Sequence, residues 1–388
     1  MLLTLTIVFW LIAAFWLFSA VVNTILVRRL APLDSLDSRD AETEAPTVSV
    51  VIPARDEADA IAAVARSFLM QEGVSLQLIV VDDRSADATT DALQAIAMED
   101  PRLEPVRIDA LPIGWLGKSH ALLVGSQRAM GAWILFADAD TTLLTPDVLR
   151  RTIELARVEG AEHVCLFPFI PAQSVWSKAM ACAFFIGAAR RLDQVNHDRP
   201  GSYFGVGAFN LVKTDLYRSF GGHEPLKLEV IDDVHIGALV RRAGGRSRFR
   251  TAFDDVQTTW GSSVSQLVRV LEKNLFAAVR YSAAMMLGYT SLFLVLWGGA
   301  VLGPVVAVVM GVWTPIAAAA ALLLSAVPAA MVARRFGWSA RVALLTPIVM
   351  PVLIYAAIRS MLLTLRRGGV AWRDTVYPLA ELKAGRFR

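Results

Sequence analysis

The sequence contains little cysteine, and its longest apolar runs contain no charged residue. Only two of its 388 residues are cysteine, and the separation of Cys165 and Cys182 matches no metal-binding spacing, which excludes a cysteine-based metal site. Residues 1–27 contain no Asp, Glu, Lys or Arg, and neither do residues 281–333. Because a transporter needs polar or charged groups inside its membrane segments, the second run argues against that class of protein.

The first uncharged run is long enough to span a lipid bilayer. Residues 1–27 predict an uncleaved N-terminal transmembrane anchor, because they lack the basic n-region of a signal peptide and their apolar part is too long for its h-region. Arg28 and Arg29 follow directly, which by the positive-inside rule places the next residues in the cytoplasm.

The C-terminal apolar residues predict two or three more membrane segments. Residues 281–333 are too long for one crossing and predict two, with a break near Gly311, Trp313 and Pro315. Residues 342–358 contain two prolines between basic flanks, and predict either a re-entrant hairpin or a conventional crossing. The net charge of +3 is concentrated at the edges of these runs, which indicates membrane topology rather than nucleic-acid binding.

Between the apolar regions, strand-like and helix-like segments alternate four times. The predicted strands are residues 48–52, 76–81, 103–108 and 133–137, and the predicted helices are residues 58–69, those after 86, 118–129 and those from Pro146 onward with Thr145 as N-cap. This alternation predicts an α/β domain with a parallel, doubly wound sheet. The first turn, "PARDEA", has no glycine-rich loop of the kind that cradles phosphate.

Charged side chains follow three of the predicted strands. They are Arg55, Asp56 and Glu57, then Asp82 and Asp83, then Asp138 and Asp140. Carboxylates repel a diphosphate unless a divalent cation lies between them, and hard oxygen ligands suit Mg²⁺ or Mn²⁺. The sequence therefore predicts a metal held by Asp138 and Asp140, although an Asp-x-Asp pair also forms ordinary turns.

Two further residues have open alternatives. One of Asp82 and Asp83 is expected to cap the following helix instead of binding a ligand. Lys118 in "GWLGKSHAL" is either a solvated lysine at a helix start or a phosphate or sugar contact.

Four segments resemble the family 2 glycosyltransferases with a GT-A fold. They are "VSVVIPARDEADAI", "LQLIVVDDRSADATTDAL", "WILFADADT" and "EVIDDVHIGALVRRAGGRSRF", within residues 47–280. The "GWLGKSHAL" segment and the flanking membrane runs are similar to the integral-membrane branch associated with hopanoid, carotenoid or sphingolipid glycosylation, which includes ceramide glucosyltransferase.

The resemblance implies a role for each matching residue. The residues that would bind the nucleotide sugar are Pro53, Arg55, Glu57, Lys118 and Ala139, and Asp83 would contact the uracil base. Asp138 and Asp140 would bind the metal. Asp233 would act as the general base, with Asp232 beside it. At Asp232 the family usually has Glu, so its role is less defined. Processive members also carry Gln-x-x-Arg-Trp, whereas this chain has Gln266, Arg269 and Val270, which argues against polymer synthesis.

The resemblance thus implies an inverting transfer of one sugar from a UDP-sugar to a membrane lipid. The alternatives are a processive polysaccharide synthase and a degenerate, inactive membrane protein. The predicted domains are an anchor (1–27), a linker (28–46), a GT-A catalytic domain (47–263), an interfacial amphipathic helix (264–284), a membrane region (285–365) and a basic cytoplasmic tail (366–388). Residues 175–192 predict a second interfacial helix, and for both helices an ordinary core helix is the alternative. The expected location is a bacterial-type inner (plasma) membrane, with the catalytic domain in the cytoplasm.

Overall fold

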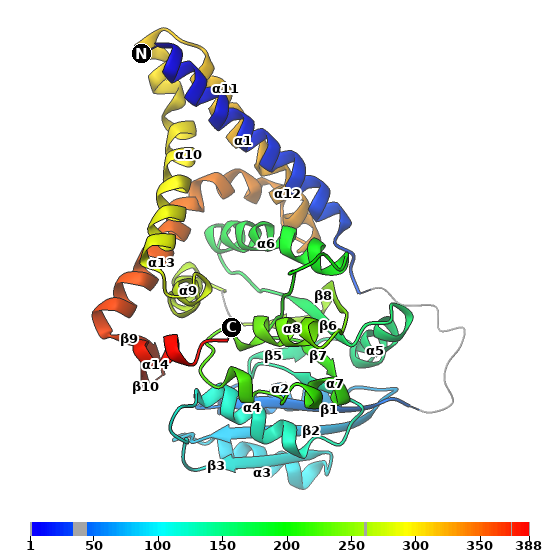
Figure 1. Ribbon diagram of the computed structural model, residues 1–388. Helices are drawn as coiled ribbons and strands as arrows, with labels where there is room; N and C mark the ends of the chain where they lie inside the picture. Colours follow the sequence, from blue (N-terminus) through cyan, green and yellow to red (C-terminus); the bar gives the residue numbers. More distant parts are fainter. Residues whose placement is uncertain (1, 34–44, 260–261, 374, 388) are drawn as a thin grey trace. The chain divides into compact units, whose positions relative to one another are not determined.

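The computed structural model describes residues 2–33, 45–259, 262–373 and 375–387 (Figure 1). The chain forms two compact units, each made from several segments. The helical unit comprises residues 1–30, 172–190 and 260–379, and the sheet unit comprises residues 31–171, 191–259 and 380–388. The domain boundaries inferred from the sequence stay predictions.

The sheet unit is built on an eight-stranded mixed sheet with the order β3-β2-β1-β4-β7-β6-β8-β5. Its first four strands confirm the predicted ones: β1 (Thr47–Ala54), β2 (Ser75–Asp83), β3 (Leu103–Ile108) and β4 (Trp133–Phe136), all parallel. The remaining strands are β5 (Thr141–Leu143), β6 (His163–Phe169), β7 (Asn210–Lys213) and β8 (Ser247–Thr258). Strand β7 runs antiparallel to β4 and β6, and β6 is parallel to β8. The α/β fold with a mostly parallel sheet is thereby confirmed.

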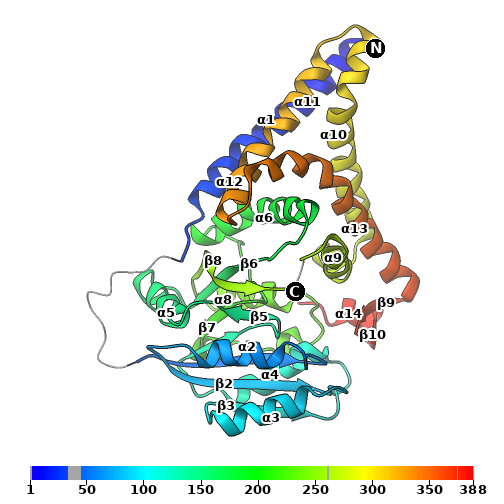
Figure 2. The same cartoon turned by 180° about the vertical axis from the view of Figure 1, so that it is seen from behind.

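Helices cover both faces of this sheet (Figures 1 and 2). They are α2 (Ile61–Leu69), α3 (Thr89–Glu99), α4 (Gly117–Arg128), α5 (Val148–Val158), α7 (Thr214–Ser219) and α8 (Asp232–Arg242), with the 3-10 turn η1 (Glu224–Leu226). Side chains alternate along a strand, so Val50 and Ile52 lie in one core while Val51 lies in the other. Burial on both faces explains why the strands read as nearly continuous apolar runs.

The start of α5 differs from its prediction, and part of the predicted linker lies against the sheet. Helix α5 begins at Val148 with Asp147 at the N-cap position, so Thr145 is not the cap. Thr145 Oγ1 instead donates to Asp255 Oδ1 over 3.0 Å, which ties the turn to β8. Residues 31–33 of the predicted linker run beside β8, where Leu33 N donates to Thr251 O over 2.8 Å. Residues 34–44 of that linker lie outside the described residues.

The helical unit contains the apolar segments. Its elements are α1 (Leu2–Arg29), most of α6 (Val175–Asn196), α9 (Val264–Ala278), α10 (Ala283–Met310), α11 (Thr314–Leu324), α12 (Ala326–Arg335), η2 (Ala340–Leu345), α13 (Thr346–Arg367), β9 (Gly369–Trp372) and β10 (Thr375–Pro378). Among the described residues, four helical stretches are long and apolar enough to cross a membrane: Leu2–Arg29, Ala283–Met310, Thr314–Arg335 and Ala340–Arg367. The predicted break is confirmed, since α10 ends before Gly311, which has a φ of 64° and a C-cap conformation that suits glycine.

Helices α6 and α9 pack on the last of these stretches. Met180, Leu267, Leu271 and Val349 share one apolar core. Helix α9 is also held to α13 by polar contacts, because Glu272 accepts from Arg359 and Arg367 over 2.9 and 3.0 Å. Both helices therefore bury apolar side chains against protein, as the core-helix alternative expects; their location at a lipid interface stays a prediction.

Candidate active site

The charged turns seen in the sequence lie at one edge of the sheet. Strands β2, β1 and β4 are parallel neighbours, and Ala54 at the end of β1 pairs with Asp82 near the end of β2. Parallel strands present their C-terminal ends at the same edge, and open α/β sheets bind their ligands there.

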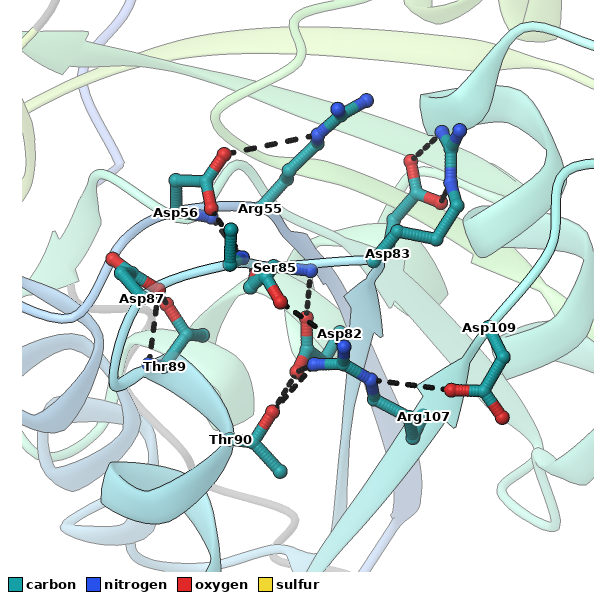
Figure 3. Close-up of polar contacts among 12 residues, drawn as sticks. Arg55, Asp56, Asp82, Asp83, Ser85, Asp87, Thr89, Thr90, Arg107 and Asp109 are labelled. Carbon is teal, nitrogen blue, oxygen red and sulfur yellow. Dashed lines mark hydrogen bonds and ion pairs between the residues drawn. The ribbon is translucent and has the colours of Figure 1, made fainter.

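The turns after β1 and β2 are joined by hydrogen bonds (Figure 3). Asp56 N donates to Ser85 Oγ over 2.9 Å, and Ala86 N donates to Asp56 Oδ1 over 2.8 Å. These bonds hold Asp56 at a φ of 52°, in the left-handed region that few non-glycine residues adopt. The turn therefore has a fixed shape, with Pro53 as the next-to-last residue of β1 and Arg55 directly after the strand.

Asp82 ties its turn together and does not cap the following helix. The N-cap residue of α3 is Ala88, with no side-chain cap, so the capping role expected for Asp82 or Asp83 is wrong. The Asp82 carboxylate accepts from Ser85 N over 3.0 Å, from Arg107 Nη1 over 2.5 Å and from the Thr90 hydroxyl. Burial raises the pKa of Asp82, but these hydrogen bonds outweigh it and lower the pKa below its ordinary value. Asp82 is therefore a structural carboxylate (Figure 3).

Asp83 lies beside the start of α4. Arg84 donates to it twice, over 2.7 and 2.9 Å. A Cβ atom on Gly117 would be 2.3 Å from Asp83 Oδ2, so the close approach requires glycine at this position. That Asp83 contacts a nucleotide base stays a prediction.

Lys118 links the strand-end carboxylates to those of α8. Its Nζ lies 2.6 Å from Asp138 Oδ1 and 4.0 Å from Asp232 Oδ1. Burial lowers the pKa of Lys118, but the charges of Asp138, Asp232 and Asp233 outweigh it and raise the pKa above its ordinary value. Lys118 is therefore a cation at neutral pH inside an acidic cluster, and not a solvated surface lysine.

Asp140 lies close to other negative charges. Burial raises the pKa of Asp140, and the charges of Asp138 and Glu57 raise it further. Hydrogen bonds from Thr258 and Thr259 lower this pKa, but the net result is a rise. Thr259 Oγ1 donates to Asp140 Oδ2 over 3.2 Å. Ala139, between the two aspartates, is 7% exposed and belongs to the apolar core, so its predicted passage close to a nucleotide stays a prediction.

Asp232 and Asp233 occupy the first turn of α8. Asp232 is 3% exposed and lies between Lys118 and His223, whose Nε2 is 3.8 Å from Asp232 Oδ2. Asp233 is partly exposed, and its Oδ2 accepts from Gly207 N over 2.9 Å. Burial raises the pKa of Asp233, Lys118 lowers it, and Asp138 raises it further, with a net rise. Of the two carboxyl groups, Asp233 is the one that a hydroxyl can reach.

Two loop glycines that no sequence motif distinguishes, Gly205 and Gly207, are part of this site. A Cβ atom on Gly205 would lie 1.7 Å from Asp233 O, and one on Gly207 would lie 2.6 Å from Asp138 Oδ2. The loop before β7 therefore passes directly against both acidic elements. The spacing of the "GVGAF" segment in the sequence gives no sign of these contacts.

Two buried histidines also support the acidic pair, and no sequence pattern points to either. His163 Nε2 lies 2.6 Å from Asn210 Oδ1, and Asn210 Nδ2 donates to Asp233 O over 3.1 Å. His223 Nδ1 lies 2.6 Å from Tyr217 Oη. Burial lowers the pKa of His163 to about 4 and that of His223 to about 3, so both are neutral at pH 7.

Most of these groups line one small pocket. Its polar lining comes from Lys118, Asp138, Gly207, Asn210, His223, Asp232 and Asp233. The residues predicted for the nucleotide are at the neighbouring turns, at the same edge of the sheet. The structure thus brings the predicted catalytic residues Asp232 and Asp233 together with Asp138 and Lys118.

The residues at this edge fit a divalent cation. In the part of the chain that the structure describes, no group of three or more His, Cys, Asp or Glu side chains is arranged to hold a metal. Mg²⁺ and Mn²⁺, however, commonly bind through one or two carboxylates together with substrate phosphates. The like charges that raise the pKa of Asp140 are those that a cation would offset.

Comparison with known proteins gives a family match for part of the chain. Residues 49–221 match the family described as Glycosyl transferase family 2. The succinoglycan biosynthesis protein ExoO of Rhizobium meliloti is 41% identical over 117 residues, which are 30% of this chain and 32% of that protein. The 4,4'-diaponeurosporenoate glycosyltransferase of Staphylococcus haemolyticus is 30% identical over 116 residues, 30% of each chain. This chain thus spans about a third of the length of these curated relatives.

The fold has a solved counterpart. A mannosyltransferase from Pyrobaculum calidifontis, in complex with GDP-Man and Mn²⁺, superposes with a TM-score of 0.52 over 94% of this chain and 98% of its own, at 17% identity. The likeness supports the GT-A fold; the hopanoid or ceramide branch suggested by the sequence stays a prediction. Residues 49–221 thus match the glycosyl transferase family 2 model, and the fold is that of a solved glycosyltransferase.

Proposed function

We propose that the protein transfers one sugar from a UDP-sugar to a membrane lipid, with inversion at the anomeric carbon and with the help of Mg²⁺ or Mn²⁺. The observation that carries this proposal is the arrangement around Lys118, which places the metal-type residue Asp138 beside the acidic pair at the start of α8. Sugar transfer needs a group that binds the metal and the donor diphosphate, and a carboxylate that can accept the proton of the acceptor hydroxyl, within one small site.

Lys118, Asp138 and Asp140 serve the donor in this proposal. A divalent cation held by Asp138 and Asp140 would offset the charge that develops on the departing diphosphate. Lys118 Nζ lies 2.6 Å from Asp138 Oδ1, and its ammonium group is suited to a phosphate oxygen once a donor is bound. Arg55, Glu57 and Asp83, at neighbouring strand ends, are proposed to orient the nucleotide.

Asp233 serves the acceptor. Its carboxylate takes the proton of the acceptor hydroxyl as the oxygen forms a bond to the anomeric carbon and the bond from that carbon to the diphosphate breaks. Attack from the face opposite the leaving group inverts the anomeric centre. The hydrogen bond from Gly207 N and the bond from Asn210 to the Asp233 carbonyl hold the base in one orientation.

The proposed acceptor is a lipid because four helical stretches among the residues that the structure describes could cross a membrane. One relative is named for glycosylation of 4,4'-diaponeurosporenoate. Addition of a single sugar is supported by Val270, which stands where processive members carry tryptophan. The basic residues Arg28 and Arg29 in the last turn of α1 support a cytoplasmic sheet unit at a bacterial inner membrane.

Metal removal provides the first test. EDTA is expected to abolish release of UDP from UDP-sugars by the purified full-length protein in bacterial lipid extract, and Mn²⁺ to restore it, because the metal offsets leaving-group charge. Asp138→Asn should lose most of the release, whereas the exposed control Asp109→Asn should keep it. Metal-independent release that survives Asp138→Asn would contradict the proposal, and release only from GDP-sugars would correct the donor.

The pH dependence provides a second test. Because burial raises the pKa of Asp233 and the base must be ionised, kcat should fall as the pH drops through a value above the ordinary aspartate pKa of about 3.9. Lys118→Gln removes a charge that lowers this pKa, so the acid limb of the kcat profile should move to higher pH. The exposed control Lys213→Gln should leave the profile unchanged. An acid limb that does not respond to Lys118→Gln would remove Asp233 from the role of base.

A further inference from the structure

The segment after the last apolar helix returns to the sheet unit. Helix α14 (Leu379–Ala384) follows β10, and Leu382 on it is 1% exposed. Residues 380–388 belong to the sheet unit, although the residues just before them belong to the helical unit. In both ribbon views the segment runs from α14 toward α8 (Figures 1 and 2).

This segment packs along the short loop that precedes α8. Gly385 lies against Leu228, since a Cβ atom on Gly385 would be 2.5 Å from Leu228 Cδ1. The next contact is to Glu229, whose carboxylate accepts from Phe387 N. The Phe387 ring lies 5.3 Å from the His235 ring, and the Arg242 guanidinium lies 4.0 Å from the centre of the Phe387 ring. Cation–π and aromatic contacts of this kind anchor the segment to α8 itself.

The same loop contacts both helices that carry the proposed catalytic groups. Lys227 O accepts from Leu116 N over 2.7 Å, and Leu116 is the N-cap residue of α4, two positions before Lys118. Glu229 Oε2 lies 3.2 Å from His235 Nδ1, on the helix that begins with Asp232. Three consecutive residues, 227–229, therefore join the start of α4, the first turns of α8 and the C-terminal segment.

Loss of the C-terminal segment would disturb this loop because Glu229 is buried. The residue is 6% exposed, and a buried carboxylate needs hydrogen-bond donors to offset its desolvation. Removing the segment takes away the backbone donor Phe387 N together with the Phe387 ring that anchors it to α8, and exposes the loop to water. The carboxylate would then be expected to turn outward, and the loop with it.

We propose that residues 380–387 are a positioning strap, which braces the loop 227–229 and so holds Lys118 and the Asp232–Asp233 pair in their catalytic arrangement. This inference rests on the function proposed above. The strap touches neither donor nor acceptor in this scheme; its residues act through Glu229 and His235. A segment that only contributed to stability would change the melting temperature and leave kcat of the folded enzyme unchanged.

The experiment removes the strap and supplies it again as a peptide. The full-length chain truncated after Leu379 is expected to lose about 10- to 100-fold in kcat, the scale expected when catalytic groups are misplaced by roughly 1 Å, with an unchanged Kd for UDP. A synthetic peptide of residues 380–388 should restore the rate, and the same peptide with Phe387→Ala should not. In the full-length chain, Phe387→Ala should reproduce the loss, while Lys383→Ala on the exposed side of α14 should not.

Hydrogen exchange tests the bracing without any need for turnover. Amides of residues 116–120 and 228–236 should exchange faster in the truncated chain and in Phe387→Ala, and the peptide should slow them again. Unchanged exchange in both variants, or wild-type kcat in both, would overturn the strap. If wild-type protein transfers no sugar, the proposed function fails, and the exchange data still decide whether the segment braces these residues.

Discussion

Asp233→Asn is expected to lower kcat by about 100- to 10,000-fold, the range over which a positioned general base contributes to a rate. Asparagine keeps the shape of the side chain and can still accept from Gly207 N, so the pocket and its backbone contacts remain. Donor binding should therefore be retained, with a Kd for UDP close to the wild-type value. Sugar transfer at saturating donor, together with calorimetric titration of UDP, separates these two quantities.

Two comparisons sharpen this result. Asp254→Asn changes an exposed aspartate on β8 in the same unit and should leave kcat unchanged. Asp232→Asn should also reduce activity, because Asp232 lies between Lys118 and His223, but it is nearly inaccessible to an acceptor at 3% exposure. An Asp233→Asn enzyme with near wild-type kcat, beside an inactive Asp232→Asn enzyme, would assign the base to Asp232.

Gly205→Ala is expected to inactivate the enzyme and to destabilise the sheet unit. The new methyl group would lie 1.7 Å from Asp233 O and 2.9 Å from Asn210 Nδ2, so backbone must move. Overpacking of this kind costs about 1–3 kcal/mol of stability, and the forced shift acts on the backbone of the proposed base. Thermal melting and sugar transfer measured on the same preparation should both decline.

The matched control is a glycine with free space. A Cβ atom on Gly187, which is exposed on α6, would meet no atom within 4 Å. Gly187→Ala should therefore leave activity unchanged and add slightly to helix stability. If Gly205→Ala had the same melting temperature and the same kcat as Gly187→Ala, the close approach of this loop to α8 would not exist in solution.

The sequence predicted the first half of the sheet well because the signal there is local. Residues 50–52 and 78–81 are buried on both faces of the sheet, so they form apolar runs that a single strand displays by itself. The charged residues after these strands were placed at one edge by the rule that parallel strands end together. That rule also placed Asp138 and Asp140 correctly at the end of β4.

The rest of the site depends on contacts between distant segments. Strand β7 has four residues and takes its position between β4 and β6 by antiparallel pairing, which no local pattern specifies. This pairing places Asn210 beneath Asp233 and brings Gly205 and Gly207 against the carboxylates. His163 and His223 are single buried histidines that belong to no motif of the sequence, so only their three-dimensional neighbours reveal what they support.

The division of the chain into units has a consequence for how the protein is made. The chain passes between the units at residues 30–31, 171–172, 190–191, 259–260 and 379–380. Its last return to the sheet unit comes 121 residues after the previous departure (380 minus 259), which is about 6 to 24 s of translation at roughly 5–20 residues per second. Three of the four apolar stretches are synthesised in that interval. The sheet unit can thus be completed only after those stretches have left the ribosome, so its maturation follows their synthesis in time.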